Sequence, residues 1–175
     1  IKETSSINQY QFESKWDGIR SQIIKRANNI SIWTRGEELV NKTFPELIKV
    51  ISDFRNDFVV DGEILIWDEN KNIPKDFSFL QKRLGRKSPS IKIQKDLPIV
   101  FVAYDILEIN GNDIRSKILS ERRNILEEKF YNSISENHLI ISKNIKITKL
   151  LQMNNWEDLE ESKISARSIN TEGLV

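Results

Sequence analysis

A lysine with two acidic neighbours and a nearby arginine lies close to the start of the chain, where residues 13–20 read ESKWDGIR. A free lysine has a pKa of about 10.4, so only about one side chain in a thousand is neutral at pH 7. Lys15 can therefore act as a nucleophile only where desolvation or neighbouring cations disfavour its charged form. Arg20 is a candidate for such a cation and for holding a phosphate group.

The pattern around this lysine predicts which side chains accompany it. Residues 10–16 predict a β-strand, in which successive side chains alternate between two faces. Glu13, Lys15 and Asp17 then share one face, and the opposite face, which points to the core, carries Phe12, Ser14 and Trp16. The Asp-Gly pair at 17–18 favours a hairpin, so we expect the chain to turn back through residues 19–24. The same pattern also fits an amphipathic hairpin whose exposed face carries a solvated Glu-Lys pair.

Further motifs follow this run in a fixed order. Residues 32–37 read IWTRGE, 58–65 read FVVDGEIL, 101–107 read FVAYDIL and 171–175 read TEGLV. Together these five segments resemble the motifs of covalent nucleotidyltransferases, the superfamily of ATP-dependent DNA ligases, RNA ligases and mRNA-capping guanylyltransferases. The second motif departs from the usual pattern because Thr34 stands where serine is common. The letters RGEELV at 35–40, followed by FPEL at 44–47, most resemble cellular ATP-dependent DNA ligases.

The resemblance implies a reaction in three nucleotidyl-transfer steps. The amine of Lys15 attacks the α-phosphate of ATP, AMP then passes to the 5′-phosphate of a nick in double-stranded DNA, and the 3′-hydroxyl finally displaces AMP. This activity would serve replication, repair or recombination, with Mg²⁺ neutralising charge on the transferring phosphate. The alternatives are an RNA ligase or capping guanylyltransferase with the same lysine chemistry, or a non-catalytic nucleic-acid-binding module.

The resemblance also assigns roles to individual side chains. Lys15 is the nucleophile, and Glu172 is expected to hold the metal, with Asp17 as a tentative second ligand. The expected nucleotide site comprises Glu13 at the adenine edge, Ser14, Arg20 at the ribose and nick phosphate, Arg35 at the 5′-phosphate, Glu63 at the ribose hydroxyl and Tyr104 stacked on adenine, with Phe101 as its substitute.

The tyrosine in this set has a second interpretation. By strand alternation alone, Tyr104 is a core residue that shares its face with Val102 and Ile106, while Asp105 points away. The position in the motif favours stacking on the base instead.

A basic stretch lies in the middle of the chain. Residues 77–95 contain no acidic residue, and their cations are Lys82, Arg83, Arg86, Lys87, Lys92 and Lys95. Such a stretch is either a phosphate-contacting surface or a solvated helix end whose cations complement the helix dipole. The family carries a similar segment to residues 80–83, which favours DNA contacts by Lys82, Arg83, Arg86 and Lys87.

Composition sets the broad class. The chain has 175 residues, of which 38% are hydrophobic and 30% charged, with a formal net charge of +1. These values fit one domain, and DNA contacts must come from local basic surfaces. The absence of cysteine excludes disulfides and thiolate metal sites. No apolar run is long enough to span a membrane and no signal peptide is visible, so we expect a soluble, monomeric, cytoplasmic protein of a bacterial or archaeal-type cell.

Periodicity predicts an α+β fold with largely antiparallel sheets and flanking helices. Helices are expected at 45–55, 77–84, 120–130 and 156–167, and strands at 58–67, 99–109 and within 139–147. The resemblance implies the ATP-grasp-like nucleotidyltransferase domain of DNA ligases, covering residues 1–175. In the family, further lysines and an oligonucleotide-binding-fold domain follow, and a DNA-binding domain can precede. We therefore expect a fragment that is weakly active or inactive on its own.

Overall fold

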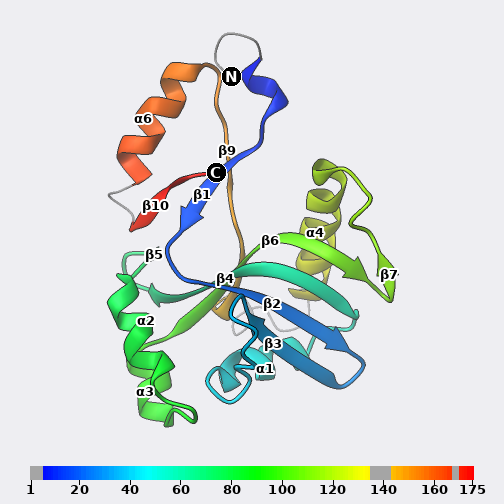
Figure 1. Cartoon of the computed structure of the whole chain (residues 1–175), viewed down its shortest axis with the longest axis vertical. Helices are drawn as coiled ribbons and strands as arrows, with labels where there is room; N and C mark the ends of the chain where they lie inside the picture. The colour runs from blue at the N-terminus through cyan, green and yellow to red at the C-terminus, as the bar shows by residue number, and fades with distance from the viewer. Residues whose placement is uncertain (1–5, 135–142, 167–169) are drawn as a thin grey trace.

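The computed structural model describes residues 6–134, 143–166 and 170–175, with backbone only at 131–134. The chain forms two sheets with helices around them, as Figure 1 shows. The predicted α+β class with largely antiparallel sheets is confirmed. Within the described residues, no helix combines the length and apolar character that crossing a membrane requires. The predicted strand residues 139–142 and helix residue Arg167 lie outside the described part.

The large sheet has seven strands, two of which are long and lie at its centre. β4 (Phe58–Asp68) and β6 (Ile99–Ile109) pair antiparallel at its centre. The path through the sheet is β3-β2-β4-β6-β7, while β5 pairs with β4 and β8 pairs with β6 in parallel. The other strands are β2 (Ile19–Arg26), β3 (Asn29–Thr34), β5 (Ile73–Pro74), β7 (Asn112–Asp113) and β8 (Ile145–Ile147).

The small sheet contains the nucleophile candidate. Its order is β10-β1-β9, formed by β1 (Phe12–Trp16), β9 (Leu150–Leu151) and β10 (Thr171–Leu174). In Figure 1 this sheet and α6 (Trp156–Ala166) lie above the large sheet.

The predicted hairpin through residues 17–24 is wrong, because β1 pairs with β9 and β10 while β2 pairs with β3 and β4. The Asp-Gly pair connects the two sheets instead of closing a two-residue turn. Gly18 lies tightly against β4, since a Cβ there would lie 2.4 Å from the carbonyl oxygen of Ile64. Glycine is thus required at 18 for close approach between backbones.

Except for the 3₁₀ helix that precedes β1, the remaining helices cover one face of the large sheet or its edges. They are the 3₁₀ helix η1 (Ile7–Gln9), α1 (Pro45–Ser52), α2 (Phe77–Leu84), α3 (Ile91–Asp96) and α4 (Leu119–Ile134). These bounds confirm the helices predicted at 45–55, 77–84 and 120–130, with shifts at their ends. The apolar stripe of α1 is buried as its spacing predicted, through Leu47, Val50 and Ile51.

Strand β4 separates the core from the opposite face of the sheet. Alternate residues from Phe58 to Ile66 belong to the main hydrophobic core, together with side chains of α1, α2 and α4. On the other face, Leu65 and Trp67 join a smaller cluster against which Trp16 packs. Asp61 and Glu63 also alternate onto this second face, where they stand in a polar cavity. One strand therefore supplies both the core and the floor of a site.

Gly62 permits the tightest contact within the core. A Cβ at this position would lie 2.3 Å from a ring carbon of Phe101 and 2.6 Å from the carbonyl oxygen of Val102. Gly62→Ala should therefore lower the free energy of unfolding by about 1–3 kcal/mol or more, as overpacking does. Urea unfolding measures this.

Gly85→Ala is the matched control, since nothing lies within 4 Å of the place that its methyl group would occupy and its φ of −63° is helical. This control should change stability by less than about 1 kcal/mol. Equal effects of the two substitutions would contradict the close approach of Phe101 to β4.

Candidate active site

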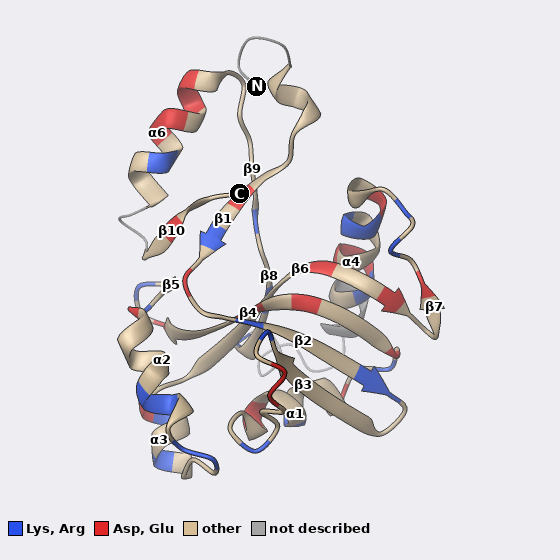
Figure 2. Ribbon diagram, viewed as in Figure 1, with Lys and Arg blue, Asp and Glu red and all other residues tan. Residues whose placement is uncertain are grey.

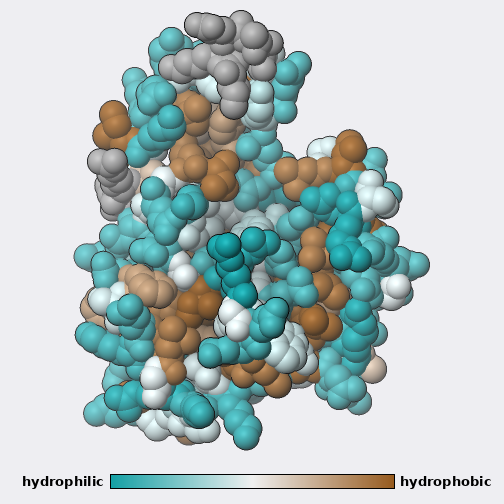
Figure 3. Space-filling view, viewed as in Figure 1, coloured by the Kyte–Doolittle hydropathy of each residue, from teal (hydrophilic) through white to brown (hydrophobic). Residues whose placement is uncertain are grey.

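A polar cavity of about 710 Å³ lies between the small sheet and the open face of the large one. Figure 3 shows this face of the molecule recessed below its upper part. The cavity is within the size range of small-molecule and cofactor sites. The residues predicted for the nucleotide site that line it are Glu13, Ser14, Lys15, Arg20, Arg35, Glu63, Tyr104 and Glu172. Strands β1, β2, β4, β6 and β10 and the turn after β3 thus converge on one space.

Lys15 and Glu172 meet across the small sheet. β1 and β10 are antiparallel with Lys15 opposite Gly173, and the register shifts after Lys15. The Lys15 ammonium forms an ion pair with the Glu172 carboxylate, with the two side chains 52% and 44% exposed. Because the pair is about half exposed, solvent and salt screen it, and a competing ligand can separate it at modest cost.

The floor of the cavity is an arginine held by a carboxylate. Arg20 on β2 lies opposite Glu63 on β4 and donates to Asp61 at 3.0 Å. Gln22 donates to the other oxygen of Asp61 at 2.9 Å. The hydrogen bond to Asp61 raises the pKa of Arg20, so this cation is fixed in position and charge. Asp61 was not among the predicted site residues, although it stands in the same DGE motif as Glu63.

Glu63 is a partly buried carboxyl on β4 that accepts a backbone hydrogen bond from the segment between the two sheets. Burial raises its pKa from 4.5 to about 7, although a backbone hydrogen bond from Gly18 and the charge of Arg20 act in the opposite direction. The negative charges of Glu172 and Asp17 add to the rise. Glu63 therefore changes charge near neutral pH, which is typical of groups at functional sites.

The raised pKa of Glu63 makes stability depend on pH. Below about pH 4.5 the Glu63 carboxyl is protonated in both the folded and the unfolded chain. Between pH 4.5 and 7 the unfolded chain loses this proton first, so the folded state is increasingly disfavoured as pH rises.

Glu63→Gln removes this penalty, so its gain in stability over the parent should be larger at pH 8 than at pH 5. Urea unfolding at both values measures it, with the exposed Glu161→Gln as control. An equal gain in stability at both pH values would contradict the raised pKa of Glu63 in the folded protein.

A β-bulge at Tyr104 brings two consecutive side chains to the cavity. Ala103 pairs with Gly62 and Asp105 with Asp61, so Tyr104 is the extra residue between them. Tyr104 shares the face of Val102 as expected, but beyond the bulge the alternation is reversed: Asp105 lines the cavity beside Tyr104, and Ile106 enters the core. Burial raises the pKa of Tyr104, so its ring stays neutral at physiological pH. Its placement supports the prediction that this ring is available to a ligand.

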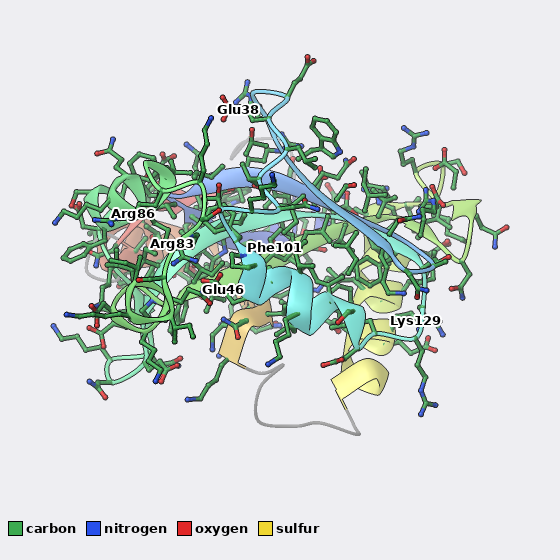
Figure 4. The ribbon with its side chains drawn as sticks, turned by 90° about the horizontal axis from the view of Figure 1, so that it is seen from below. Glu38, Glu46, Arg83, Arg86, Phe101 and Lys129 are labelled. Atoms are coloured by element: carbon green, nitrogen blue, oxygen red, sulfur yellow. The ribbon has the colours of Figure 1, made fainter. Side chains whose placement is uncertain are left out.

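Phe101 is not a substitute for Tyr104. Its side chain is completely buried in the main core, and Figure 4 shows it beneath the sheet. The prediction of Phe101 as a stacking residue is therefore wrong, because alternation along β6 places it on the side away from the cavity.

Two further cavity acids are each paired with an arginine of α4. Arg122 binds Asp105 through two hydrogen bonds of 2.8 and 2.9 Å. Arg123 lies 3.5 Å from Glu13, whose residue is only 8% exposed. Neither arginine was assigned a role by the sequence. The available signal was the pair of consecutive arginines at 122–123, within the helix predicted at 120–130.

The carboxylates suit a metal bound jointly with phosphate. Within the described residues there is no group of three or more acidic or histidine side chains that could hold an ion. Mg²⁺ commonly uses one or two carboxylates together with substrate phosphates and water, so Glu172 fits such a role. Asp17 is not one of the cavity-lining residues, and its pKa is raised by burial and then by the charges of Glu172 and Asp76.

The basic stretch is divided between surface and core. Lys82, Arg86 and Lys87 are exposed, and Figure 2 shows blue segments on α2 and α3. Arg83 is wholly buried and binds Glu46 of α1 at 2.5 Å, as Figure 4 illustrates. The prediction that Arg83 contacts DNA is wrong, because the helical period of α2 turns it inward one turn after the buried Leu80.

Comparison with known proteins agrees with this geometry. Residues 2–175 match the family model described as the ATP dependent DNA ligase domain, and the chain belongs to this family. A probable DNA ligase of Koribacter versatilis is 36% identical over 118 residues, covering 67% of this chain and 20% of the relative. The DNA ligase of Methanocaldococcus jannaschii is 28% identical over 174 residues, covering 94% and 30% respectively.

Solved structures share the fold. Mycobacterial DNA ligase D complexed with ATP and MES gives a TM-score of 0.66 at 23% identity, covering 94% of this chain and 46% of that one. Chlorella virus DNA ligase-adenylate gives 0.60 at 17% identity, covering 97% and 56%. The chain spans between 11% and 30% of the length of the curated relatives it matches.

Proposed function

We propose that this chain is the nucleotide-binding part of a DNA ligase in which Lys15 takes AMP from ATP and passes it to the 5′-phosphate of nicked double-stranded DNA. The observation that carries the proposal is the convergence of side chains from distant motifs on one cavity. Lys15, Arg20, Glu63, Tyr104 and Glu172 come from separate strands and line the same space. A nucleophile, a cation, a buried acid and an aromatic face together suit a nucleotide.

The covalent step follows from the arrangement of Lys15. Its amine must lose a proton and separate from Glu172 before its lone pair attacks the α-phosphate. A nitrogen–phosphorus bond then forms, and the bond from phosphorus to the pyrophosphate oxygen breaks. Mg²⁺, held by Glu172 together with phosphate oxygens, would neutralise negative charge on the phosphates. Arg20, anchored on Asp61, is placed to bind an anion at the floor.

The other side chains position the nucleotide. Tyr104 offers a neutral ring for stacking on adenine. Because the pKa of Glu63 is about 7, its carboxyl can either accept a hydrogen bond from a ribose hydroxyl or donate one to it near neutral pH. Arg35 is exposed on the turn after β3, where its backbone N–H donates to the carbonyl of Arg20. An exposed arginine beside the cavity suits the 5′-phosphate of a nick. Ser14 is available as a further hydrogen-bonding group.

Incubation of the full-length protein with ATP and Mg²⁺ should add one AMP to Lys15. Lys15→Ala and Lys15→Arg should both abolish the addition, because arginine is not deprotonated in proteins and cannot attack. Intact-mass and peptide mass spectrometry measure it. The exposed Lys163→Ala on α6 is the control and should retain the addition. AMP on another residue, or retained in Lys15→Ala, would rule out the proposed nucleophile.

DNA binding should depend on the exposed part of the basic stretch. Replacing Lys82, Arg86 and Lys87 by glutamine should weaken binding and reduce the salt dependence by about one log-log unit per lost phosphate contact. Attachment of AMP should remain near the parent level, because these residues are not among those lining the cavity. Titrations of nicked DNA at several salt concentrations test this.

A triple variant of lysines elsewhere, Lys42, Lys71 and Lys163, is the matched control. It removes the same charge from other surfaces of the chain. If both triple variants lose the same affinity and the same salt dependence of DNA binding, binding depends on the overall charge of the chain and not on this surface.

A further inference from the structure

Two consecutive arginines at the start of α4 face two acids of the cavity wall. Arg122 binds Asp105 on β6, and Arg123 binds Glu13 on β1. Both acids line the cavity, whereas neither arginine is among the lining residues. The arginines therefore stand behind the wall and act on the cavity through the carboxylates.

Arg123 is held on three sides. Its Nε donates to Glu127 one helical turn later at 2.6 Å, and its Nη2 donates to the carbonyl of Thr148 at 2.5 Å. Its Nη1 faces Oε1 of Glu13 at 3.5 Å. The side chain is 6% exposed, so the guanidinium has little freedom to move away. A rigid fork of donors suits this task, which a single ammonium cannot reproduce.

Glu13 lines the cavity, and one of its two carboxylate oxygens is bonded within the protein. Gln11 donates to Oε1 at 2.5 Å, and Arg123 faces the same oxygen. Among the described residues, Oε2 has no hydrogen-bond partner, although Glu13 lines the cavity. A ligand in the cavity therefore meets an acceptor that the protein leaves available.

The charge of Glu13 depends on Arg123. Burial raises the pKa of Glu13, and the charge of Asp105 raises it further, while the Gln11 hydrogen bond and the Arg123 cation lower it. Asp105 is itself bound by Arg122. Among the described charged groups that act on Glu13, Arg123 is the cation that favours the carboxylate. Without it, Glu13 would be a buried acid beside another acid.

We propose that Arg123 is a positioning residue that sets base selectivity by holding Glu13 as a hydrogen-bond acceptor toward the cavity. The inference rests on the proposed function, in which a purine nucleotide occupies this site and Glu13 meets the edge of its base. An ionised carboxylate only accepts hydrogen bonds, so it favours a purine with a 6-amino donor and disfavours one with a 6-oxo acceptor. A protonated carboxyl can donate to the 6-oxo group, and the discrimination is then lost.

Equilibrium binding of AMP and IMP tests the inference without the covalent step. Affinities of the full-length protein are measured by calorimetry from pH 5.5 to 8.5. The parent should favour AMP by about tenfold or more, the usual worth of a charge-assisted hydrogen bond. In Arg123→Met this ratio should fall toward one at the low end of this pH range and recover as pH rises, because Glu13 then ionises at a higher pH than in the parent.

Three variants separate selectivity from a merely structural role. Glu127→Gln removes the partner of Arg123 within α4 but leaves the contact with Glu13, so it should keep the parental ratio. Arg123→Lys keeps the positive charge and should retain part of the preference. Glu13→Gln should lower the preference and remove its dependence on pH, and adding Arg123→Met to it should change the ratio no further.

Carbon-13 NMR of the glutamate carboxyls gives a readout that needs no nucleotide. The Glu13 signal, assigned through Glu13→Gln, should titrate at a higher pH in Arg123→Met than in the parent, because the Arg123 cation lowers the pKa of Glu13. If Arg123→Met does not fold, the neutral variant Arg123→Gln carries the same comparison. An unchanged AMP-to-IMP ratio, or an unchanged Glu13 titration, in folded Arg123→Met or Arg123→Gln overturns the inference. Failure of the parent to bind either nucleotide overturns the proposed function itself, and the inference with it.

Discussion

The passage of the chain from β1 to β2 is the constraint on which the site depends. Gly18 lies so close to β4 that a Cβ there would collide with a backbone oxygen and with side chains of Glu63 and Leu65. Its backbone also forms a hydrogen bond with Glu63. Because this crossing is short and tight, Lys15 and Arg20 are held on different sheets while both line one cavity. The position of Lys15, the proposed nucleophile, relative to Arg20 at the floor follows from a glycine contact.

Much of this arrangement could be predicted from the sequence. The order of motifs, together with strand and helix periodicity, indicated the main strands and helices and placed Lys15, Glu63, Tyr104 and Glu172 in one site. The long strand at 99–109 has the bounds that its β-branched and aromatic residues predicted. Local patterns are sufficient where each residue's role is set by its near neighbours along the chain.

The errors arise where the outcome depends on distant partners. The Asp-Gly pair favours a hairpin locally, but β10 and β4 compete for β1 and β2 and prevent it. Alternation failed beyond Tyr104, at Asp105 and Ile106, because a bulge opposite Asp61 and Gly62 inserts one residue. Arg83 was interpreted as a surface cation because its partner Glu46 lies on another helix. Three polar atoms of that pair, Glu46 Oε2 and Arg83 Nε and Nη1, lack hydrogen-bond partners within the described part of the chain, so its burial is costly and the pair must stay together.

The pairing of β1 with β10 has a consequence for how the protein becomes competent during synthesis. The ribosome produces Lys15 well before residues 171–174, which form the strand beside it. The large sheet can begin to form from segments already released, since β2, β3 and β4 are close in sequence. A nascent chain therefore carries the Lys15 amine without the neighbouring acid until Glu172 has been made.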